Sequence, residues 1–225
     1  MSKHIEFEAG STTGGGELAA PAGNEKVGAI VVVQEWHGIN DEMRAKVDRF
    51  AREGFLALAP DLYHGKVTTD DAEASKLMAT LDFAGAVREI GAAVQWLKGQ
   101  PRSNGKVAVL GFCMGGALTL AAAATLPGIA CAVPFYGIPD LSKLDLSKVT
   151  APIQAHFAEH DDWASPQKAR LIEAELKAKG KSIELHVYEG AGHAFMRDSD
   201  TTKYHEPSAK KAWPRTVAFL REHVG

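Results

Sequence analysis

The sequence predicts an α/β fold: a doubly wound, mostly parallel sheet with helices on both faces, in a single domain spanning residues 1–225. Short runs rich in Val, Ile and Ala alternate with longer segments of helical periodicity, an order typical of βαβ units. The run GAIVVVQ at residues 28–34 is almost continuously apolar, as expected for a strand buried on both faces. A chain of 225 residues is long enough to bury the core of one such domain.

The first half of the chain begins with strands. We expect a strand at residues 4–8, a surface turn or edge hairpin within residues 10–24, and strands at residues 28–34 and 55–59. Residues 41–52 form the first expected helix, because apolar residues recur on one face and Gly54 follows as a stop. Residues 70–100 carry helical periodicity in two pieces that meet near Leu81.

The second half continues the alternation. The expected elements are strands at residues 106–110, 131–135, 153–157 and 183–188, and an alanine-rich helix at residues 114–125. Ser165 and Pro166 open a further helix that runs to Gly180, since Ser can cap a helix and Pro tolerates its first turn. The last helix ends near Val224, and Pro214 predicts either a kink in this helix or its start.

The composition limits the classes of function. The chain has 25 Lys and Arg against 28 Asp and Glu, and its dispersed basic residues form no nucleic-acid-binding patch or membrane-binding helix. No apolar run can span a bilayer, and the N-terminus MSKHIEFEAG lacks a signal-peptide core. Two cysteines without a cluster indicate a reducing compartment. We expect a cytoplasmic protein, a monomer or weak homodimer, that acts on a small molecule without a cofactor or a metal.

The loop after the strand at residues 106–110 holds a candidate nucleophile. Residues 111–116 read GFCMGG, which is the G-x-S-x-G nucleophile elbow with Cys113 in the serine position. The glycines allow strand and helix to cross closely around a strained turn, and the N-terminus of the following helix favours a thiolate. A buried, unreactive cysteine is the alternative interpretation of this residue taken alone.

Two later strand ends supply partners for this thiol. The loop AEHDDW at residues 158–163 offers Asp161, with Asp162 as a competitor, and the glycine-flanked loop after the strand at residues 183–188 offers His193. The order nucleophile, acid, histidine is the chain order of hydrolases built on this elbow. His193 is therefore the expected general base, and the acid is expected to orient it.

An earlier loop, QEWHGIN at residues 34–40, follows the buried strand. In a fold with this elbow, an amide from such a loop and the amide after the nucleophile form the oxyanion hole, which nominates the backbones of Trp36 and Met114. Glu35 is unusual at the end of a buried strand, because carboxylates are seldom buried without a partner. An exposed, inactive Glu35 is the alternative.

Together these residues resemble the dienelactone hydrolase (carboxymethylenebutenolidase) family of the α/β-hydrolase fold. The matching pieces are QEWHGIN at 34–40, APDLYHG at 59–65, GFCMGG at 111–116, FYG at 135–137, AEHDDW at 158–163 and AGHAFMR at 191–197. They occur in the family's order and cover most of the chain. The resemblance implies that a triad of Cys113, Asp161 and His193 opens a cyclic enol-lactone.

The resemblance also implies roles for residues around the triad. Glu35 matches a glutamate that holds the resting thiol and is displaced when substrate binds, Arg197 matches an arginine that binds a substrate carboxylate, and Tyr136 matches a tyrosine near the pocket. The chain lacks the second carboxylate-binding arginine of the best-known members, and Lys66 is the candidate replacement. Trp36 is bulkier than the usual residue at its position and is expected to narrow the pocket.

Two other functions remain open at this level. A broader carboxylesterase or thioesterase could use the same triad. A non-hydrolytic protein could instead use Cys113 as a redox-sensing thiol, although no second cysteine lies near it in sequence. The i, i+4 pair His156 and His160 spans a predicted strand and a loop, so its spacing does not favour a zinc site.

Overall fold

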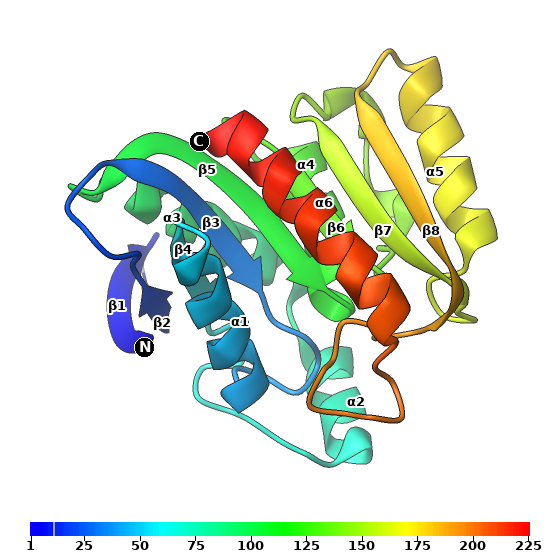
Figure 1. Cartoon of the computed structure of the whole chain (residues 1–225), viewed down its shortest axis with the longest axis horizontal. Helices are drawn as coiled ribbons and strands as arrows, with labels where there is room; N and C mark the ends of the chain where they lie inside the picture. The colour runs from blue at the N-terminus through cyan, green and yellow to red at the C-terminus, as the bar shows by residue number, and fades with distance from the viewer. Residues whose placement is uncertain (11) are drawn as a thin grey trace.

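The computed structural model describes residues 1–10 and 12–225. One eight-stranded sheet has the strand order β1-β2-β4-β3-β5-β6-β7-β8, as Figure 1 shows. The strands are β1 (Lys3–Ala9), β2 (Thr12–Ala19), β3 (Val27–Val33), β4 (Leu56–Pro60), β5 (Ser103–Phe112), β6 (Ala132–Phe135), β7 (Ile153–His160) and β8 (Ile183–Gly192). β2 runs antiparallel to both β1 and β4, and every pairing from β4 to β8 is parallel. The predicted, mostly parallel sheet is confirmed.

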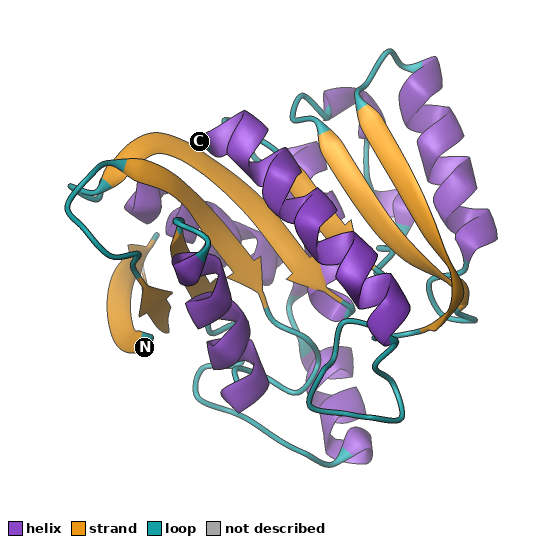
Figure 2. Cartoon of the chain, viewed as in Figure 1, coloured by secondary structure: helices purple, strands orange, loops and turns teal. Residues whose placement is uncertain are grey.

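Helices cover both faces of this sheet (Figure 2). They are α1 (Asp41–Arg52), α2 (Asp71–Thr80), α3 (Phe83–Lys98), α4 (Met114–Thr125), α5 (Pro166–Ala178) and α6 (Glu206–Val224), with short 3-10 turns η1 (Leu141–Lys143) and η2 (Leu146–Lys148). α1 and α6 pack on one face, and α3, α4 and α5 pack on the other. α2 lies beyond the carboxyl ends of the central strands, and Ala74 is its one buried residue.

The two cores meet at the central strands. Ile30 and Val32 of β3 point into the cluster with α1 and α6, whereas Val31 and Val33 point into the cluster with α3 and α4. All four are completely buried. This alternation is the period-2 geometry of a strand, and it explains why β3 reads as a continuous apolar run. None of the helices in the described residues is long and apolar enough to cross a membrane.

Several boundaries differ from the sequence prediction. The region expected as a turn or edge hairpin contains a full strand, β2, inserted between β1 and β4, and residue 11 within that region lies outside the described residues. α6 begins at Glu206, so Pro214 lies inside the helix and does not start it. Pro207 supplies the earlier start, because the first turn of a helix has no use for the missing N–H.

The crossing of α4 over the strand ends depends on glycine. A Cβ atom on Gly115 would lie 2.4 Å from the carbonyl oxygen of Val33 and 2.6 Å from that of Gln34, and one on Gly111 would lie 2.3 Å from the carbonyl oxygen of Gly115. These neighbours are backbone atoms, which cannot rotate away as a side chain would. The absence of side chains here lets the first turn of α4 sit directly on β3 and β5.

We predict that Gly115→Ala destabilises the protein by at least about 1–3 kcal/mol, because the new methyl group overlaps fixed carbonyl oxygens. Urea denaturation followed by circular dichroism measures the effect. Gly99→Ala is the matched control, since its Cβ would sit 3.5 Å from the nearest atom, an ordinary contact. Equal stability of the two variants would contradict the packing argument.

Candidate active site

Cys113 occupies the sharp turn between β5 and α4. Its backbone has φ 55° and ψ −118°, a conformation that side-chain-bearing residues seldom adopt. The turn is fixed by hydrogen bonds on both sides: the Cys113 amide donates to the Phe135 carbonyl (3.1 Å), and the amides of Gly116 and Ala117 donate to the Cys113 carbonyl. Strain of this kind, on the order of 1–3 kcal/mol, is held only where neighbouring contacts enforce it. The predicted nucleophile elbow is therefore the local geometry of Cys113.

Three side chains from three strand ends form one chain of contacts. Nε2 of His193 lies 3.2 Å from Sγ of Cys113, and Nδ1 of His193 lies 2.8 Å from Oδ2 of Asp161. The other carboxylate oxygen of Asp161 accepts hydrogen bonds from the amides of Trp163 and Ala164, each at 2.9 Å. This arrangement assigns the Nδ1 proton to the carboxylate side and leaves Nε2 facing the thiol.

The structure also separates the two candidate acids. The Asp161 carboxylate is completely buried and bonds His193, whereas Asp162 is exposed. Burial alone would raise the pKa of Asp161, but the hydrogen bond and charge of His193, with the two loop amides, outweigh it and lower that pKa. Asp161 therefore stays ionised beside the imidazole.

The surroundings of Cys113 favour the neutral thiol. Burial contributes most to a raised Cys113 pKa, and the negative charges of Glu35 and Asp161 raise it further. The Met114 amide and the Arg197 guanidinium oppose this effect. The thiolate that a nucleophile needs is therefore disfavoured unless its proton can pass to a nearby base.

Glu35 follows the end of β3 and is buried, with 6% of its surface exposed, so the alternative of an exposed side chain is wrong. Its Oε1 accepts a hydrogen bond from the hydroxyl of Tyr136 at 3.4 Å. Tyr136 is itself fully buried, has a left-handed φ of 33°, and packs edge-on against His193 with ring centroids 5.2 Å apart. In this structure the hydrogen-bonding partner of the Cys113 thiol is His193, and that of Glu35 is Tyr136.

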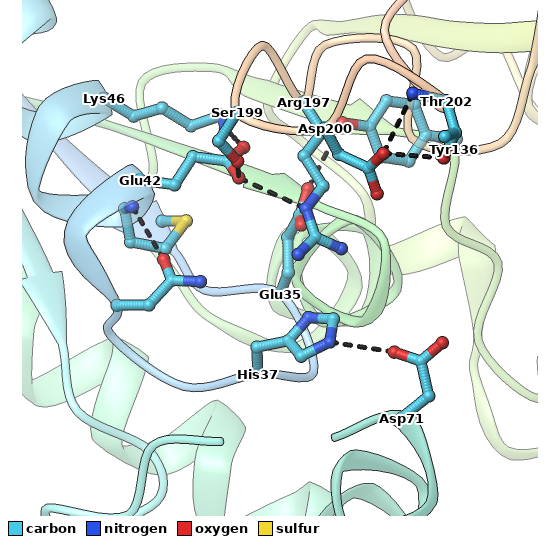
Figure 3. A network of polar contacts seen from close by, with 12 residues as sticks. Glu35, His37, Glu42, Lys46, Asp71, Tyr136, Arg197, Ser199, Asp200 and Thr202 are labelled. Atoms are coloured by element: carbon cyan, nitrogen blue, oxygen red, sulfur yellow. Dashed lines mark hydrogen bonds and ion pairs between the residues drawn. The ribbon is translucent and has the colours of Figure 1, made fainter. Parts of the chain in front are cut away.

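Arg197 approaches the same place from the loop after β8. Its Nε donates to Oε2 of Glu42 on α1 at 3.2 Å. In Figure 3 the two terminal nitrogen atoms of Arg197 turn away from Glu42 and toward the side where His37 lies. The guanidinium is thus anchored through one nitrogen and presents the other two.

A cavity of about 560 Å³ opens over Cys113. The sequence-predicted residues that line it are Glu35, Trp36, Cys113, His193 and Arg197. Trp36 bears the amide nominated for the oxyanion hole. The partner amide, on Met114, is the first of α4, where an N–H has no acceptor within its own helix. Trp36 lies in the loop that follows β3, and Met114 is the first residue of α4, as the sequence analysis expected.

Lys66 does not reach this cavity. It is exposed and lines a separate hollow with Tyr63 and Leu77, on another side of α2. The expectation that Lys66 replaces the missing arginine finds no support in this placement. Lys203, on the loop between β8 and α6, is a lysine that does line the cavity over Cys113.

Sequence analysis missed other cavity residues as well. α2 and the turn before it contribute Thr69, Asp71, Ser75 and Met78 to the wall. These residues belong to no motif, so the only available signal was the weak apolar face of α2. His37 and Trp163 adjoin predicted residues, and their positions inside quoted loops could have nominated them.

Trp163 forms part of the rim of the cavity. It is 55% exposed, unusual for an indole, and packs edge-on against His193 with ring centroids 5.7 Å apart. Its ring also lies 6.3 Å from that of Trp36. The two indoles therefore line the cavity on the side of His193.

His156 and His160 lie outside the cavity over Cys113 and have partners of their own. Across the described chain no three His, Cys, Asp or Glu side chains gather as metal ligands would. His156 is enclosed under α6, with Nδ1 2.8 Å from the Tyr188 hydroxyl and Nε2 3.1 Å from Oε1 of Gln154. His160 is exposed and contacts Glu159.

Comparison with known proteins agrees with this geometry. The sequence profile of the dienelactone hydrolase family matches residues 15–224. The chain is 33% identical to protein usf of Aquifex pyrophilus, with 100% of both chains covered. It is 32% identical to the carboxymethylenebutenolidase of Pseudomonas putida, with 91% of this chain and 90% of the relative covered. The crystal structure of a candidate dienelactone hydrolase from Klebsiella pneumoniae superposes with a TM-score of 0.87 at 26% identity, covering 98% of each chain.

The matched residues include every strand-end loop that meets at Cys113, so sequence and architecture identify the same group of proteins. The predicted fold class and the resemblance are both confirmed. The chain belongs to the dienelactone hydrolase family, and it is a carboxylic ester hydrolase with the α/β-hydrolase fold.

Proposed function

We propose that this protein opens an enol-lactone such as a dienelactone, with Cys113 as nucleophile, His193 as general base and acid, and Asp161 as the group that orients His193. One observation carries the proposal. Sγ of Cys113 lies 3.2 Å from Nε2 of His193, Nδ1 of His193 lies 2.8 Å from Oδ2 of Asp161, and both Cys113 and His193 line a cavity of about 560 Å³. Nucleophile, base and orienting acid within hydrogen-bonding reach are the arrangement that covalent acyl transfer requires.

In the first half-reaction the thiol proton passes to Nε2 of His193 as Sγ attacks the lactone carbonyl carbon. The carbonyl oxygen becomes an oxyanion, which we expect the amides of Trp36, in the cavity wall, and of Met114, at the start of α4, to bind. As the tetrahedral intermediate collapses, the ring C–O bond breaks and the leaving enol oxygen takes the proton from His193. The product of this step is a thioester on Cys113.

In the second half-reaction His193 removes a proton from water, which attacks the thioester carbonyl. The C–S bond then breaks, and Sγ recovers a proton from His193. Because the leaving group of a lactone stays attached to the acyl group, the released product is a single ring-opened acid. The ionised Asp161 stabilises the imidazolium in both halves.

The electrostatics of the resting site suit a nucleophile that is activated by its substrate. Burial and Glu35 raise the pKa of Cys113, so the free enzyme holds a protonated, unreactive thiol. An anionic substrate is drawn to the free nitrogen atoms of Arg197, in the same cavity as Glu35. We infer that a carboxylate on the substrate is the group recognised there, and that the thiol ionises once Glu35 has shifted.

The family relationship supports a lactone or ester as substrate, and the relative from Pseudomonas putida is named for carboxymethylenebutenolide. A broader carboxylesterase or thioesterase would use the same three residues. The two activities differ in their dependence on a substrate carboxylate, because an ester without that group has nothing to pair with the two terminal nitrogen atoms of Arg197.

We predict that Cys113→Ala lowers kcat for a dienelactone and for 4-nitrophenyl acetate by at least about 10⁴-fold, since the acyl acceptor is lost. Loss of the dienelactone absorbance and release of nitrophenolate measure the two rates. Cys131→Ala is the matched control, because Cys131 is a second buried thiol and does not line the cavity. Wild-type turnover by Cys113→Ala would remove this residue from the mechanism.

We predict that Glu35→Gln shifts the pH profile for alkylation of Cys113 by iodoacetamide to lower pH. The negative charge of Glu35 raises the pKa of the thiol in the wild type, and the variant lacks that charge. Below pH 8 the variant should react roughly 3–10-fold faster than the wild type. Intact-protein mass against time measures the rate. Glu6→Gln, an exposed substitution on β1, should leave the profile unchanged, and an unchanged profile for Glu35→Gln would refute the role of this carboxylate.

A further inference from the structure

We propose that Glu42 is a positioning residue that orients Arg197 and thereby sets the preference for substrates that carry a carboxylate. This inference rests on the proposed function. Glu42 lies on α1, does not line the cavity, and touches none of the reacting groups. Its direct contact with a residue of the cavity wall is the one with Arg197.

The carboxylate of Glu42 collects three donors from two parts of the chain. Lys46, one turn further along α1, contacts it directly, as do Nε of Arg197 at 3.2 Å and the hydroxyl of Ser199 (Figure 3). The side chains of Glu42 and Lys46 are only 6% and 8% exposed. Buried charges are rare unless they are paired, so this group is a built feature of the fold.

The geometry divides the nitrogen atoms of Arg197 between two tasks. Nε is taken by Glu42, and across the described residues no acceptor is recorded for the two terminal nitrogens. Those nitrogens form the planar fork that binds a carboxylate through two parallel hydrogen bonds. A long, flexible side chain that is already fixed loses less freedom when the ligand arrives, which favours binding.

Lys46 explains how Glu42 can hold Arg197 without cancelling its attraction for anions. Two cations share one carboxylate, so the group of Lys46, Glu42 and Arg197 keeps a net charge of +1. Lys46 also lies 5.2 Å from the centroid of the Phe112 ring, directly before Cys113 in the chain. Lys46 thus balances the charge of Glu42, and the charge of Arg197 stays uncompensated within this group.

Two esters of equal length test the proposal: 4-nitrophenyl hydrogen glutarate, which ends in a carboxylate, and 4-nitrophenyl pentanoate, which ends in a methyl group. We expect Glu42→Gln to raise KM for the glutarate about 5–10-fold with little change in kcat. The substitution weakens the charge-assisted hydrogen bond from Nε of Arg197 to residue 42, so the guanidinium is no longer held in the orientation that binds the substrate carboxylate. The kinetic constants for the pentanoate should stay within twofold. Initial rates, corrected for hydrolysis without enzyme, measure both.

Ser199→Ala is the matched control. It removes another contact between Glu42 and the loop after β8 while leaving the contact to Arg197 Nε in place. A merely structural tether would be weakened by both variants, whereas a device that orients Arg197 is weakened by Glu42→Gln alone. Equal ratios of the two substrates for Ser199→Ala and the wild type support the proposal, and a ratio lowered as in Glu42→Gln overturns it.

Arg197→Lys keeps the inference testable if Glu42→Gln folds poorly. A lysine carries the charge but cannot contact Glu42 through Nε and present a fork at the same time. It should lose the glutarate preference, and Glu42→Gln added to it should change the preference no further. A full additional loss in the double variant would show that Glu42 acts independently of Arg197.

Failure of this inference and failure of the proposed function give different results. If Glu42→Gln weakens both esters equally while Cys113→Ala abolishes both, the positioning role is wrong and the function stands. If Cys113→Ala retains both activities, the function is wrong, whatever Glu42→Gln does.

Discussion

The close approach of the first turn of α4 to the ends of β3 and β5 is the constraint on which the site depends. Because Gly111 and Gly115 have no side chains, backbone meets backbone there, and the chain must turn sharply at Cys113. That turn lifts the thiol out of the sheet into the cavity that the other strand-end loops border. His193 and Asp161 reach it only because β7 and β8 end at the same edge.

The same geometry buries the thiol of Cys113 close to two carboxylates, which disfavours the thiolate. A buried sulfur next to Glu35 and Asp161 is poorly suited to carry a charge, and its pKa is raised accordingly. Arg197 and the amide of Met114 act in the opposite direction. The raised pKa favours the neutral thiol when no substrate is bound. In the proposed function, displacement of Glu35 changes this balance in favour of the thiolate.

The sequence was sufficient for the parts of the site that belong to local motifs. Cys113 and His193 follow from glycine-flanked loops at strand ends, and the alternation of strands and helices gave the sheet. Sequence favoured Asp161 but kept Asp162 as a competitor, because the burial of each is decided by the tertiary turn of the loop. The place of Lys203 in the cavity wall and the contact of Glu42 with Arg197 escaped it for a related reason: both join segments far apart in the chain, without any local pattern.

The central claim is that Cys113 carries the acyl group between the two half-reactions. Its most direct test is intact-protein and peptide mass spectrometry of wild-type enzyme quenched in acid within milliseconds of mixing with 4-nitrophenyl pentanoate. The account predicts an added pentanoyl mass on the peptide that contains Cys113, removable by neutral hydroxylamine as a thioester is. Turnover under the same conditions with the acyl group on another residue would contradict it.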